Sequence, residues 1–458
     1  MKNKYTKLQL LSSAPVSQSL LAMGLPICLG MLINALYNLA DAYFVSGLGK
    51  SQLGAISVVF PLSQVVVSLG LMFGSGAASC LPRLLGAGNL QEANRTASTA
   101  LYGSLLAGAA IISLFLLSLR PVLHWLGATP TIMPYALPYA KIYLAASIFN
   151  IFNVTMNNIA ASEGAAKTTM SALLLSATLN IILDPFFIYQ LGFGISGAAI
   201  ATAISQMFSS LIYFAYIIRG KSVFSFSVQY FSLNKAILTA ILGIGLPTMF
   251  FQLLTSLSIS LINQAAQPFG DAAIAALGAV SRITAMETLL VFGFLKGFQP
   301  LAGFSYGAAN LPRLKLCIKT ALRWSNIFCL AVGLLTVLLA EPIIAQFASN
   351  ADGNLEITSI GTKALQASGI SFIFFGFYTL YSSLLLALGK AKAGMLLGAC
   401  RQGICFIPII WLLPKFGQLN GLIYAQPLAD IMAAIITLPT ATWLHKQINR
   451  IEKNSLNN

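Results

Sequence analysis

Long apolar stretches, separated by short polar breaks, run along the whole chain. A helix needs about 20 apolar residues to cross the hydrocarbon core of a bilayer. Stretches of that length predict twelve membrane-spanning helices, near residues 17–42, 53–80, 94–118, 134–158, 168–190, 195–218, 236–265, 274–303, 316–340, 360–386, 393–413 and 419–443. A membrane barrel would show short segments of alternating polarity instead. The pattern therefore predicts an all-α integral membrane protein.

The composition agrees with this prediction. Of the 458 residues, 57% are hydrophobic and 8% are charged, and the mean hydropathy is +0.82. Soluble domains carry about a quarter charged residues. We expect no cleavable signal peptide, because the first apolar stretch is too long and continues into the pattern of the bundle.

The basic residues predict the orientation in the membrane. Most of them flank the stretches on the side that also holds both termini, and the other side has only Lys50, Arg120, Lys141, Lys363 and Lys415. Because basic loops stay in the cytoplasm, we expect a multi-pass protein of the plasma (inner) membrane with both termini cytoplasmic. The formal net charge of +15 then reflects topology. It predicts no nucleic-acid partner, since the bases do not gather on one amphipathic face.

The first six stretches resemble the second six. The repeated positions include Gly24-Leu25-Pro26 with Gly245-Leu246-Pro247, Gly86-Ala87 and Asn89 with Gly307-Ala308 and Asn310, and Pro185 with Pro408. Six crossings bring the chain back to its starting side, so the two copies are parallel repeats related by a pseudo-twofold axis along the membrane normal. We predict an N-terminal six-helix lobe at 1–218, a cytoplasmic linker at 219–235, a C-terminal six-helix lobe at 236–443 and a polar, frayed cytoplasmic tail at 444–458.

Two acids in the first half lie deep in apolar stretches. In the first stretch, Asn34, Asn38 and Asp41 follow each other at spacings of four and three, which places them on one helical stripe. In the fifth, Asn180 and Asp184 are four residues apart and share a face. An ionisable group near the bilayer centre costs a few kcal/mol, so such residues are candidates for function.

The predicted topology brings these acids to similar depth. Asp41 and Asp184 both fall in the outer-leaflet half of their stretches, and Thr202 lies at a comparable level in the sixth. Two carboxyl groups in a dry lobe can hold a proton near neutral pH, because desolvation and mutual repulsion favour the neutral form. They can equally coordinate Na⁺ with oxygen ligands. The structural alternative is that the acids only bond to neighbouring helices.

Two prolines interrupt the same helices. Pro26 and Pro185 each remove a backbone hydrogen bond and kink the helix that holds them. Since Pro185 directly follows Asp184, movement at this kink would reach the acid. A static kink that only shapes the bundle is the other interpretation.

The second half carries a different set of charges in its apolar stretches. Glu287 and Asp430 could face a cationic substrate in a central cavity. Alternatively they pair internally, Glu287 with Arg282 or Lys296 and Asp430 with Arg401.

Other chemistry is sparse. The six cysteines show neither metal-ligand spacing nor a disulfide framework. There is no nucleotide-binding loop and no nucleophile constellation, so we predict no cofactor, no metal other than a coupling Na⁺, and no enzyme. We expect Glu163, near the inner end of the fourth stretch, to be a solvated loop acid beside Lys167.

Several segments together resemble the multidrug and toxic compound extrusion (MATE) family, and the match extends over all twelve stretches. They are Asn34 to Gly49 (NALYNLADAYFVSGLG), Leu53 to Pro61 (LGAISVVFP), Asn180 to Pro185 (NIILDP) and Gly197 to Thr202 (GAAIAT). Arg401-Gln402-Gly403 followed by Ile407-Pro408 is similar to the bacterial drug-efflux branch.

The resemblance implies two six-helix lobes and cation-driven antiport of bulky, often cationic, organic compounds. It also implies ion-coupling roles for Asp41, Asn180, Asp184 and Thr202, with Tyr139 and Asn157 joining that network. The second half departs from the acidic pattern: Ile407 stands where the first half has Asp184, and Asn263 lies nearest to the counterpart of Asp41.

We therefore expect an antiporter that exports organic, cationic drugs or toxic compounds in exchange for H⁺ or Na⁺. Its partners would be small organic substrates and membrane lipids, and it would function as a monomer. The alternative is a lipid-linked glycan flippase of the same superfamily, which would line its cavity with several basic residues. A passive channel is less consistent with duplicated lobes, and an intramembrane enzyme is the most distant alternative.

Overall fold

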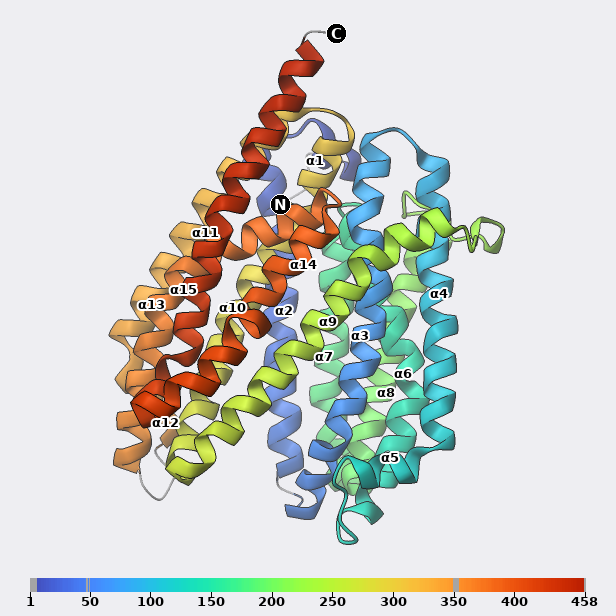
Figure 1. Cartoon of the computed structure of the whole chain (residues 1–458). Coiled ribbons are helices and arrows are strands. Elements are labelled where there is room, and N and C mark those ends of the chain that lie inside the picture. The colour runs from blue at the N-terminus through green and yellow to red at the C-terminus, as the bar shows by residue number, and fades with distance from the viewer. Residues whose placement is uncertain (1–5, 47, 49, 349–353, 457–458) are drawn as a thin grey trace.

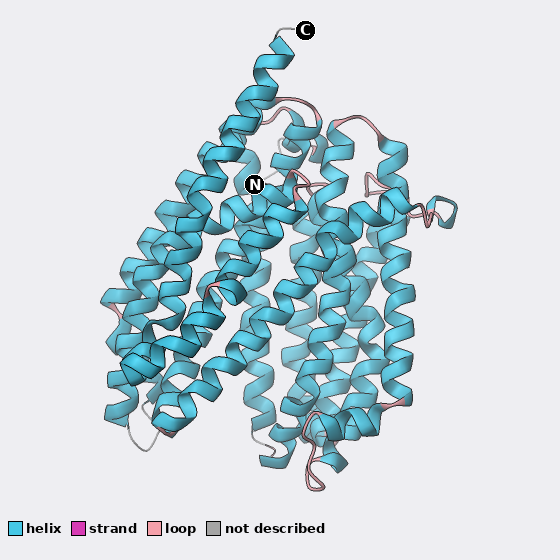
Figure 2. Ribbon diagram, in the orientation of Figure 1, coloured by secondary structure: helices cyan, strands magenta, loops and turns pink. Residues whose placement is uncertain are grey.

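The computed structural model describes residues 6–46, 48, 50–348 and 354–456. Within these ranges the chain is built from helices joined by short connections, and it contains no strand (Figures 1 and 2). The predicted all-α class is confirmed. Residues 1–5 and 457–458 of the predicted terminal segments lie outside the described residues.

The helices of the first half are α1 (Lys7–Ser12), α2 (Val16–Ser46), α3 (Lys50–Gly86), α4 (Leu90–Leu117), α5 (Leu119–Trp125), α6 (Met133–Ser162), α7 (Ala166–Pro185), the π-helical turn η1 (Phe186–Gln190) and α8 (Gly194–Ile218). Those of the second half are α9 (Lys235–Ala266), α10 (Asp271–Gly307), α11 (Leu311–Leu338), α12 (Ala340–Ala348), α13 (Asn354–Ala387), α14 (Ala391–Ala399), the π-helical turn η4 (Cys400–Ile404) and α15 (Phe406–Leu456). Short 3-10 turns, η2 (Val228–Tyr230) and η3 (Gln267–Phe269), flank α9.

The twelve predicted crossings correspond to these helices. By length and hydropathy alone, ten segments of the described chain could span a membrane. One of them, Ala391–Lys453, has 63 residues, about three times what one crossing needs. It is two crossings, because Gln418 (φ 48°, ψ −130°) breaks the helix inside α15, which folds back (Figure 1). The twelfth crossing is α6, whose more polar sequence keeps it out of the ten.

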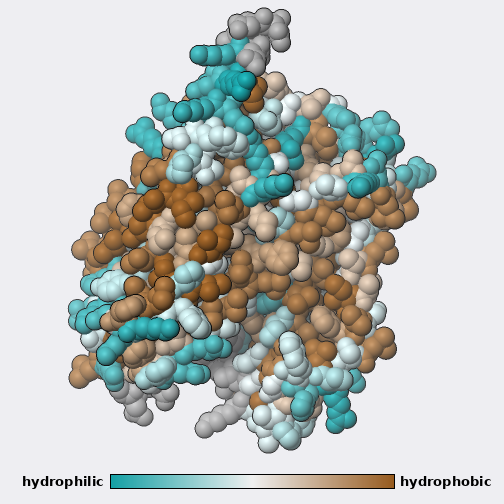
Figure 3. All heavy atoms as spheres, viewed as in Figure 1, coloured by the Kyte–Doolittle hydropathy of each residue, from teal (hydrophilic) through white to brown (hydrophobic). Residues whose placement is uncertain are grey.

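The surface matches a membrane environment. Figure 3 shows a broad apolar band across the visible face, with hydrophilic side chains gathered above and below it. Large apolar side chains such as Leu117, Ile218 and Trp411 are exposed. A soluble monomer rarely exposes apolar patches of this extent, so the chain is a multi-pass membrane protein.

Both termini lie at one end of the bundle, here called the termini end, and α5 and α12 lie at the opposite, far end (Figure 1). The last helix does not fray at residue 444, as the sequence had suggested, but continues to Leu456. Side-chain contacts hold it: His445 and Tyr381 are hydrogen-bonded at 2.8 Å, and Lys315 forms an ion pair with Glu452. The expected frayed tail is wrong for the residues that the structure describes.

The segment between the two halves is pinned to the first. α8 ends at Ile218 and α9 begins at Lys235. Between them, the backbone carbonyls of Ser225, Phe226 and Ser232 accept hydrogen bonds from three side chains of α4, at 2.7 to 3.1 Å. This segment therefore packs on α4 rather than hanging free.

The repeat reappears in the local structure. Asn89 caps the N-terminus of α4, where its side chain accepts from the backbone N–H of Glu92, and Asn310 caps α11 in the same way through Arg313. A cap of this kind satisfies an N–H group that the helix itself cannot. Equivalent turns thus start the third long helix of each half.

The two halves exchange packing partners across their interface. α2 packs against α10, and α3 packs against α9. Ile237 and Ile241 of α9 belong to the apolar core of the first half, whereas Val16 and Leu20 of α2 belong to that of the second. The first helix of each half therefore leans on the opposite lobe.

Glycines allow the closest approach between the lobes. A Cβ at Gly245 of α9 would lie 1.9 Å from the Met72 carbonyl oxygen of α3, and one at Gly307 of α10 would lie 2.1 Å from that of Arg83. Neither position has room for a side chain. All these contacts fall in the half of the bundle nearest the termini, so the lobes are closed against each other there.

Candidate ion-coupling site and inter-lobe cavity

The fifth crossing of the first lobe carries two buried polar residues one helical turn apart. Asn180 and Asp184 are 1% and 0% exposed on α7. The amide nitrogen of Asn180 donates to Asp184 Oδ1 at 3.4 Å and to Thr202 Oγ1 of α8 at 3.3 Å. The four-residue spacing places both groups on one face, and α8 packs beside α7. Three of the four residues expected at the site are therefore in contact.

Asp41 of α2 completes the group. Its carboxyl group lies close enough to that of Asp184 for the two acids to interact. Two neighbouring carboxylates repel each other in a dry environment, so a proton on one of them would stabilise this arrangement. Asp184 Oδ2 and Asn180 Oδ1 are buried without a hydrogen-bond partner among the described residues. The site thus has acceptors that a proton or a cation would satisfy.

Three tyrosine side chains lie around the two acids. Tyr139 of α6 lies close enough to interact electrostatically with both Asp41 and Asp184, as does Tyr37. The Tyr139 ring stacks on that of Tyr143, with centroids 6.2 Å apart and planes 14° apart. Tyr37 and Tyr143 were not predicted, although each lies four residues from a predicted member, Asp41 and Tyr139.

Asn157 does not join this network. Its amide donates to the hydroxyl group of Tyr213 at 3.1 Å. Asn157 follows Tyr139 by 18 positions on the same helix, which corresponds to about 27 Å along the axis. The two side chains therefore lie at different depths, and only Tyr139 is near the acids. The side chain of Asn38 lies outside the described residues.

The two prolines differ in their local structure. Pro26 lies inside α2, which continues through it. Pro185 ends α7, and the chain passes directly into the π-helical turn η1. Single π-helical turns within α-helices are frequent at functional sites. Asp184 therefore stands immediately before a break in the regular helix.

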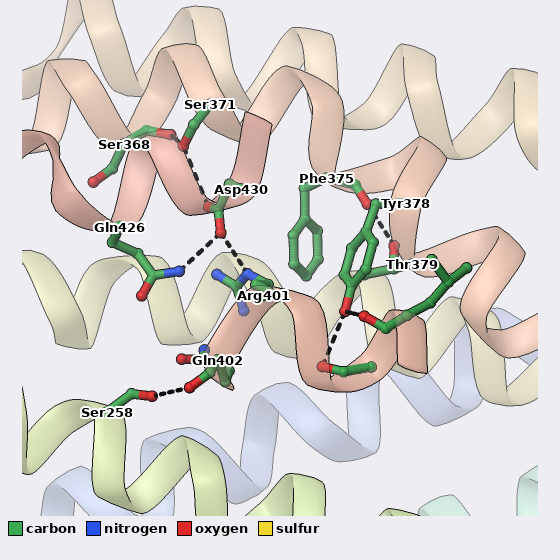
Figure 4. Close-up of polar contacts among 12 residues, drawn as sticks. Ser258, Ser368, Ser371, Phe375, Tyr378, Thr379, Arg401, Gln402, Gln426 and Asp430 are labelled. Carbon is green, nitrogen blue, oxygen red and sulfur yellow. Dashed lines mark hydrogen bonds and ion pairs between the residues drawn. The ribbon is translucent and has the colours of Figure 1, made fainter. Parts of the chain in front are cut away.

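Asp430 and Glu287 of the second lobe contact other protein groups, and Figure 4 shows those around Asp430. Asp430 forms an ion pair with Arg401 at 2.8 Å and also accepts from Gln426 and Ser371, at 2.8 and 3.4 Å. Glu287 accepts from the Thr336 hydroxyl at 2.5 Å and forms no ion pair among the described residues. Internal pairing is therefore confirmed for Asp430 and wrong for Glu287, because the Glu287 carboxyl turns toward α11.

A cavity of about 320 Å³ lies between the lobes. Its walls are largely apolar and aromatic, with contributions from α2, α3, α6, α9, α10, α13 and α14. Within the described part of the chain, its charged lining residues are Lys296 and Arg401, and neither Glu287 nor Asp430 lines it. The expectation that these two acids face the cavity does not match this geometry, because each is turned toward a protein partner.

Glu163 does not lie in a solvated loop, as was expected from the sequence. It is 0% exposed, immediately after α6, and accepts from the hydroxyl groups of Tyr216 and Ser222 and from the N–H of Val223. Burial raises the pKa of Glu163 above its ordinary value, and the nearby Lys7 ammonium group opposes that rise. The sequence alone could not show this burial, because the residues that cover Glu163 lie after α8, about sixty positions later in the chain.

Metal-ligand clusters do not occur in the portion of the chain that the structure describes: no group of three or more His, Cys, Asp or Glu side chains comes together there. Any Na⁺ at the acid pair would have to use amide and hydroxyl oxygens as well.

Comparisons with known proteins agree with this architecture. The multidrug export protein MepA of Staphylococcus saprophyticus is 26% identical over 436 residues, covering 95% of each chain. A crystal structure of MATE in complex with MaL6 has a TM-score of 0.92 and 27% identity, and covers 98% of this chain and 100% of that chain. An outward-facing multidrug resistance MATE family transporter of the MOP superfamily has a TM-score of 0.90 and 27% identity, covering 98% and 99%.

The family model called MatE matches residues 26–186 and again residues 247–412, one segment in each half. The two matches agree with the internal repeat, and together they cover more than half of the chain. This chain therefore belongs to the MatE family of membrane transporters.

Proposed function

We propose that this protein is a secondary active antiporter that exports organic compounds and is driven by a cation bound between Asp41 and Asp184. Two of the relatives named above are a multidrug export protein and a multidrug resistance transporter, which supports the direction and the broad class of substrate. The placement of the two acids beside each other carries the proposal. Desolvation and mutual repulsion keep two neighbouring carboxyl groups from both ionising in a dry lobe, so binding or release of a proton changes the charge of the site.

The proton is the better candidate for the coupling ion. The Asn180 amide nitrogen points toward both Asp184 and Thr202. A donor directed at Asp184 Oδ1 and Thr202 Oγ1 leaves these two oxygens less available to a Na⁺ ion, whereas a proton can be held by two neighbouring acids. Sodium coupling would require the amide to turn its oxygen inward.

The packing supports alternating access. The lobes are closed at the termini end through α3 with α9 and α2 with α10. Asp41 and Asp184 lie on α2 and α7, the two helices that contain Pro26 and Pro185. A change of charge at the acid pair can therefore bias the position of α2, which contacts the second lobe, and the lobes can rock about the cavity.

We propose that the termini end faces the cytoplasm, as the distribution of basic residues indicates, and that the protein acts as a monomer within membrane lipids. Single cysteines replacing Lys221 and Lys392, introduced into a chain without its native cysteines, should be labelled only after the membrane is permeabilised. Labelling of both from outside intact cells would contradict the orientation.

The flippase alternative has less support. Lys296 and Arg401 are the bases of the described cavity wall, and Arg401 is already paired with Asp430. One free base is a weak site for a diphosphate group. The same two bases, with no acid in the described cavity wall, also give little support to the expected cationic substrate.

Transport in proteoliposomes tests the proposal. We expect export against a concentration gradient when a pH gradient is imposed, and little export with a Na⁺ gradient alone at constant pH. Export with the Na⁺ gradient only would make Na⁺ the coupling ion. Equal rates without any gradient would exclude antiport.

A further inference from the structure

The charged groups of the inter-lobe cavity point to a substrate of the opposite sign from the one expected. The described lining includes two cations, Lys296 and Arg401, and no Asp or Glu. Glu287 and Asp430 do not line the cavity: Glu287 accepts from Thr336 through one oxygen and keeps the other buried, and Asp430 pairs with Arg401. Organic cations bind to acidic groups or to the faces of aromatic rings. The described wall offers aromatic rings but no acid, and its formal charge is positive.

The two cations are not equivalent. The Arg401 guanidinium is neutralised by Asp430 at 2.8 Å and lies over the Phe375 ring, 4.7 Å from its centroid (Figure 4). The Lys296 ammonium group has no hydrogen bond, ion pair or ring contact among the described residues. A cation that is partly buried within a membrane protein is costly without a partner. Lys296 is therefore the uncompensated charge of the cavity.

The surroundings of Lys296 are arranged as a binding surface. Leu289, Phe292, Lys296 and Gln299 follow each other on α10 at spacings of three, four and three, and all line the cavity. The Gln299 amide makes no hydrogen bond among the described residues. This stripe therefore presents an ammonium group, a free amide and an aromatic ring to the same space.

The rest of the wall suits a bulky, largely apolar molecule. Phe250, Phe251 and Tyr378 contribute rings, and Gln252 contributes a second amide with no hydrogen bond in the described structure. The volume of about 320 Å³ falls at the lower end of the range for small-molecule sites. A flat aromatic body with one acidic group would meet rings on its faces and Lys296 at its acidic end.

We propose that the cavity binds amphipathic organic anions, such as aromatic sulfonates or carboxylates, through a salt bridge to Lys296. This inference rests on the proposed export function for its role in transport but not for the binding itself. Charge-assisted hydrogen bonds are stronger than neutral ones, so the acidic group would decide which aromatic compounds are selected.

Two probes that share a ring and differ in charge test the proposal: naphthalene sulfonate and naphthyl-trimethylammonium. Binding is measured by calorimetry on the full chain in nanodiscs of phosphatidylcholine, which adds no net charge from lipid. We expect the wild type to prefer the sulfonate. Lys296→Gln should weaken sulfonate binding about tenfold or more and leave the ammonium probe unchanged or slightly improved.

Two further variants make the result specific. Lys296→Arg keeps the charge and should retain the preference for the sulfonate. Lys319→Gln removes a lysine from the exposed side of α11, outside the cavity lining, and should change neither affinity. Preference of the wild type for the ammonium probe, or unchanged sulfonate affinity in Lys296→Gln, would overturn the proposal. If that variant does not fold, the comparison of the two probes on the wild type still decides.

Transport separates this inference from the proposed function. Sulfonate binding that depends on Lys296, without export under a pH gradient, would leave the binding site intact and reject the antiporter. Gradient-driven export of the ammonium probe alone would support the antiporter and reject the anion site.

Discussion

The fifth crossings of the two lobes differ in the partner that each gives to its buried charged residue. In the first lobe, α7 brings Asp184 against a second acid, Asp41, just before the π-helical turn η1. In the second lobe, α14 passes into the π-helical turn η4, where Arg401 meets Asp430. Both lobes interrupt the helix near a charged residue, but only the second supplies a counter-charge.

This difference separates a site that can change its charge from one that is already neutral. Asp430 accepts three hydrogen bonds, including one from the guanidinium group of Arg401. Asp184 keeps an oxygen that no described protein donor satisfies, and so does Glu287 of the second lobe, but only Asp184 of these two has a second acid beside it. Unsatisfied buried acceptors need an explanation, and binding of a proton supplies one. We infer that ion coupling belongs to the first lobe, whereas the second lobe positions groups along the cavity.

The largest expected effect is the loss of coupling when either first-lobe acid is neutralised. Asp41→Asn and Asp184→Asn nearly preserve shape, but neither amide can gain or lose a proton at the site. Gradient-driven export should fall to background in both variants, measured in proteoliposomes at equal protein content. Folding should be maintained, because a neutral amide costs less to bury than a carboxylate.

Asp430→Asn is the matched control for these variants. It neutralises an acid of similar burial that already has a cationic partner, so the dependence on the pH gradient should remain. Loss of that dependence in a folded Asp430→Asn protein would show that coupling is shared between the lobes.

The next effect in size concerns stability. Arg401→Gln leaves Asp430 as a buried carboxylate without its cation, and breaking one side of a buried ion pair costs about 3 kcal/mol or more. The midpoint of denaturant unfolding in detergent should therefore drop clearly. The double variant Arg401→Gln with Asp430→Asn should recover part of the loss, because neither group is then charged. No difference between the single and double variants would mean that the pair contributes little.

The sequence predicted most of the fold because its signals are local or repeated. Apolar length gave the twelve crossings, and the matched positions around Asn89 and Asn310 became equivalent helix caps. Asn180 and Asp184 could be placed together because a spacing of four fixes one helical face. Thr202 followed from depth in the membrane, which the topology sets.

The rest depended on contacts between distant segments. Long helices that are apolar on all sides do not indicate which face is inward, so the cavity position of Lys296 could not be read from α10. The burial of Glu163 results from the segment after α8, and the Glu287 carboxyl turns to Thr336 on another helix. In each case the pairing follows from packing and not from spacing.

A smaller effect on export is expected from removal of the Thr202 hydroxyl group. Thr202→Val keeps the side-chain shape but removes the oxygen that accepts from Asn180. One such hydrogen bond contributes about 1 kcal/mol net, or roughly a fivefold change in an equilibrium. The proton concentration for half-maximal export should shift by about that factor while maximal export persists. Complete loss of export would mean that Thr202 is a direct ligand of the ion.

The smallest effect on transport is expected at Glu163, which is as buried as Asp184 but fully hydrogen-bonded. Glu163→Gln should leave the dependence on the pH gradient unchanged.

The effect of Glu163→Gln should appear in the stability of the folded protein instead. Burial raises the pKa of Glu163 in the folded protein, so the folded state holds this proton more tightly than the unfolded state does. The resulting stabilisation is complete below about pH 4.5 and is lost as the pH rises through the higher folded value. The unfolding midpoint of the wild type minus that of Glu163→Gln should therefore decrease as the pH rises from 4.5 toward neutrality. A changed coupling ratio in this variant would show that a satisfied buried acid can also drive transport, and the contrast between Asp184 and Asp430 would then lose its physical basis.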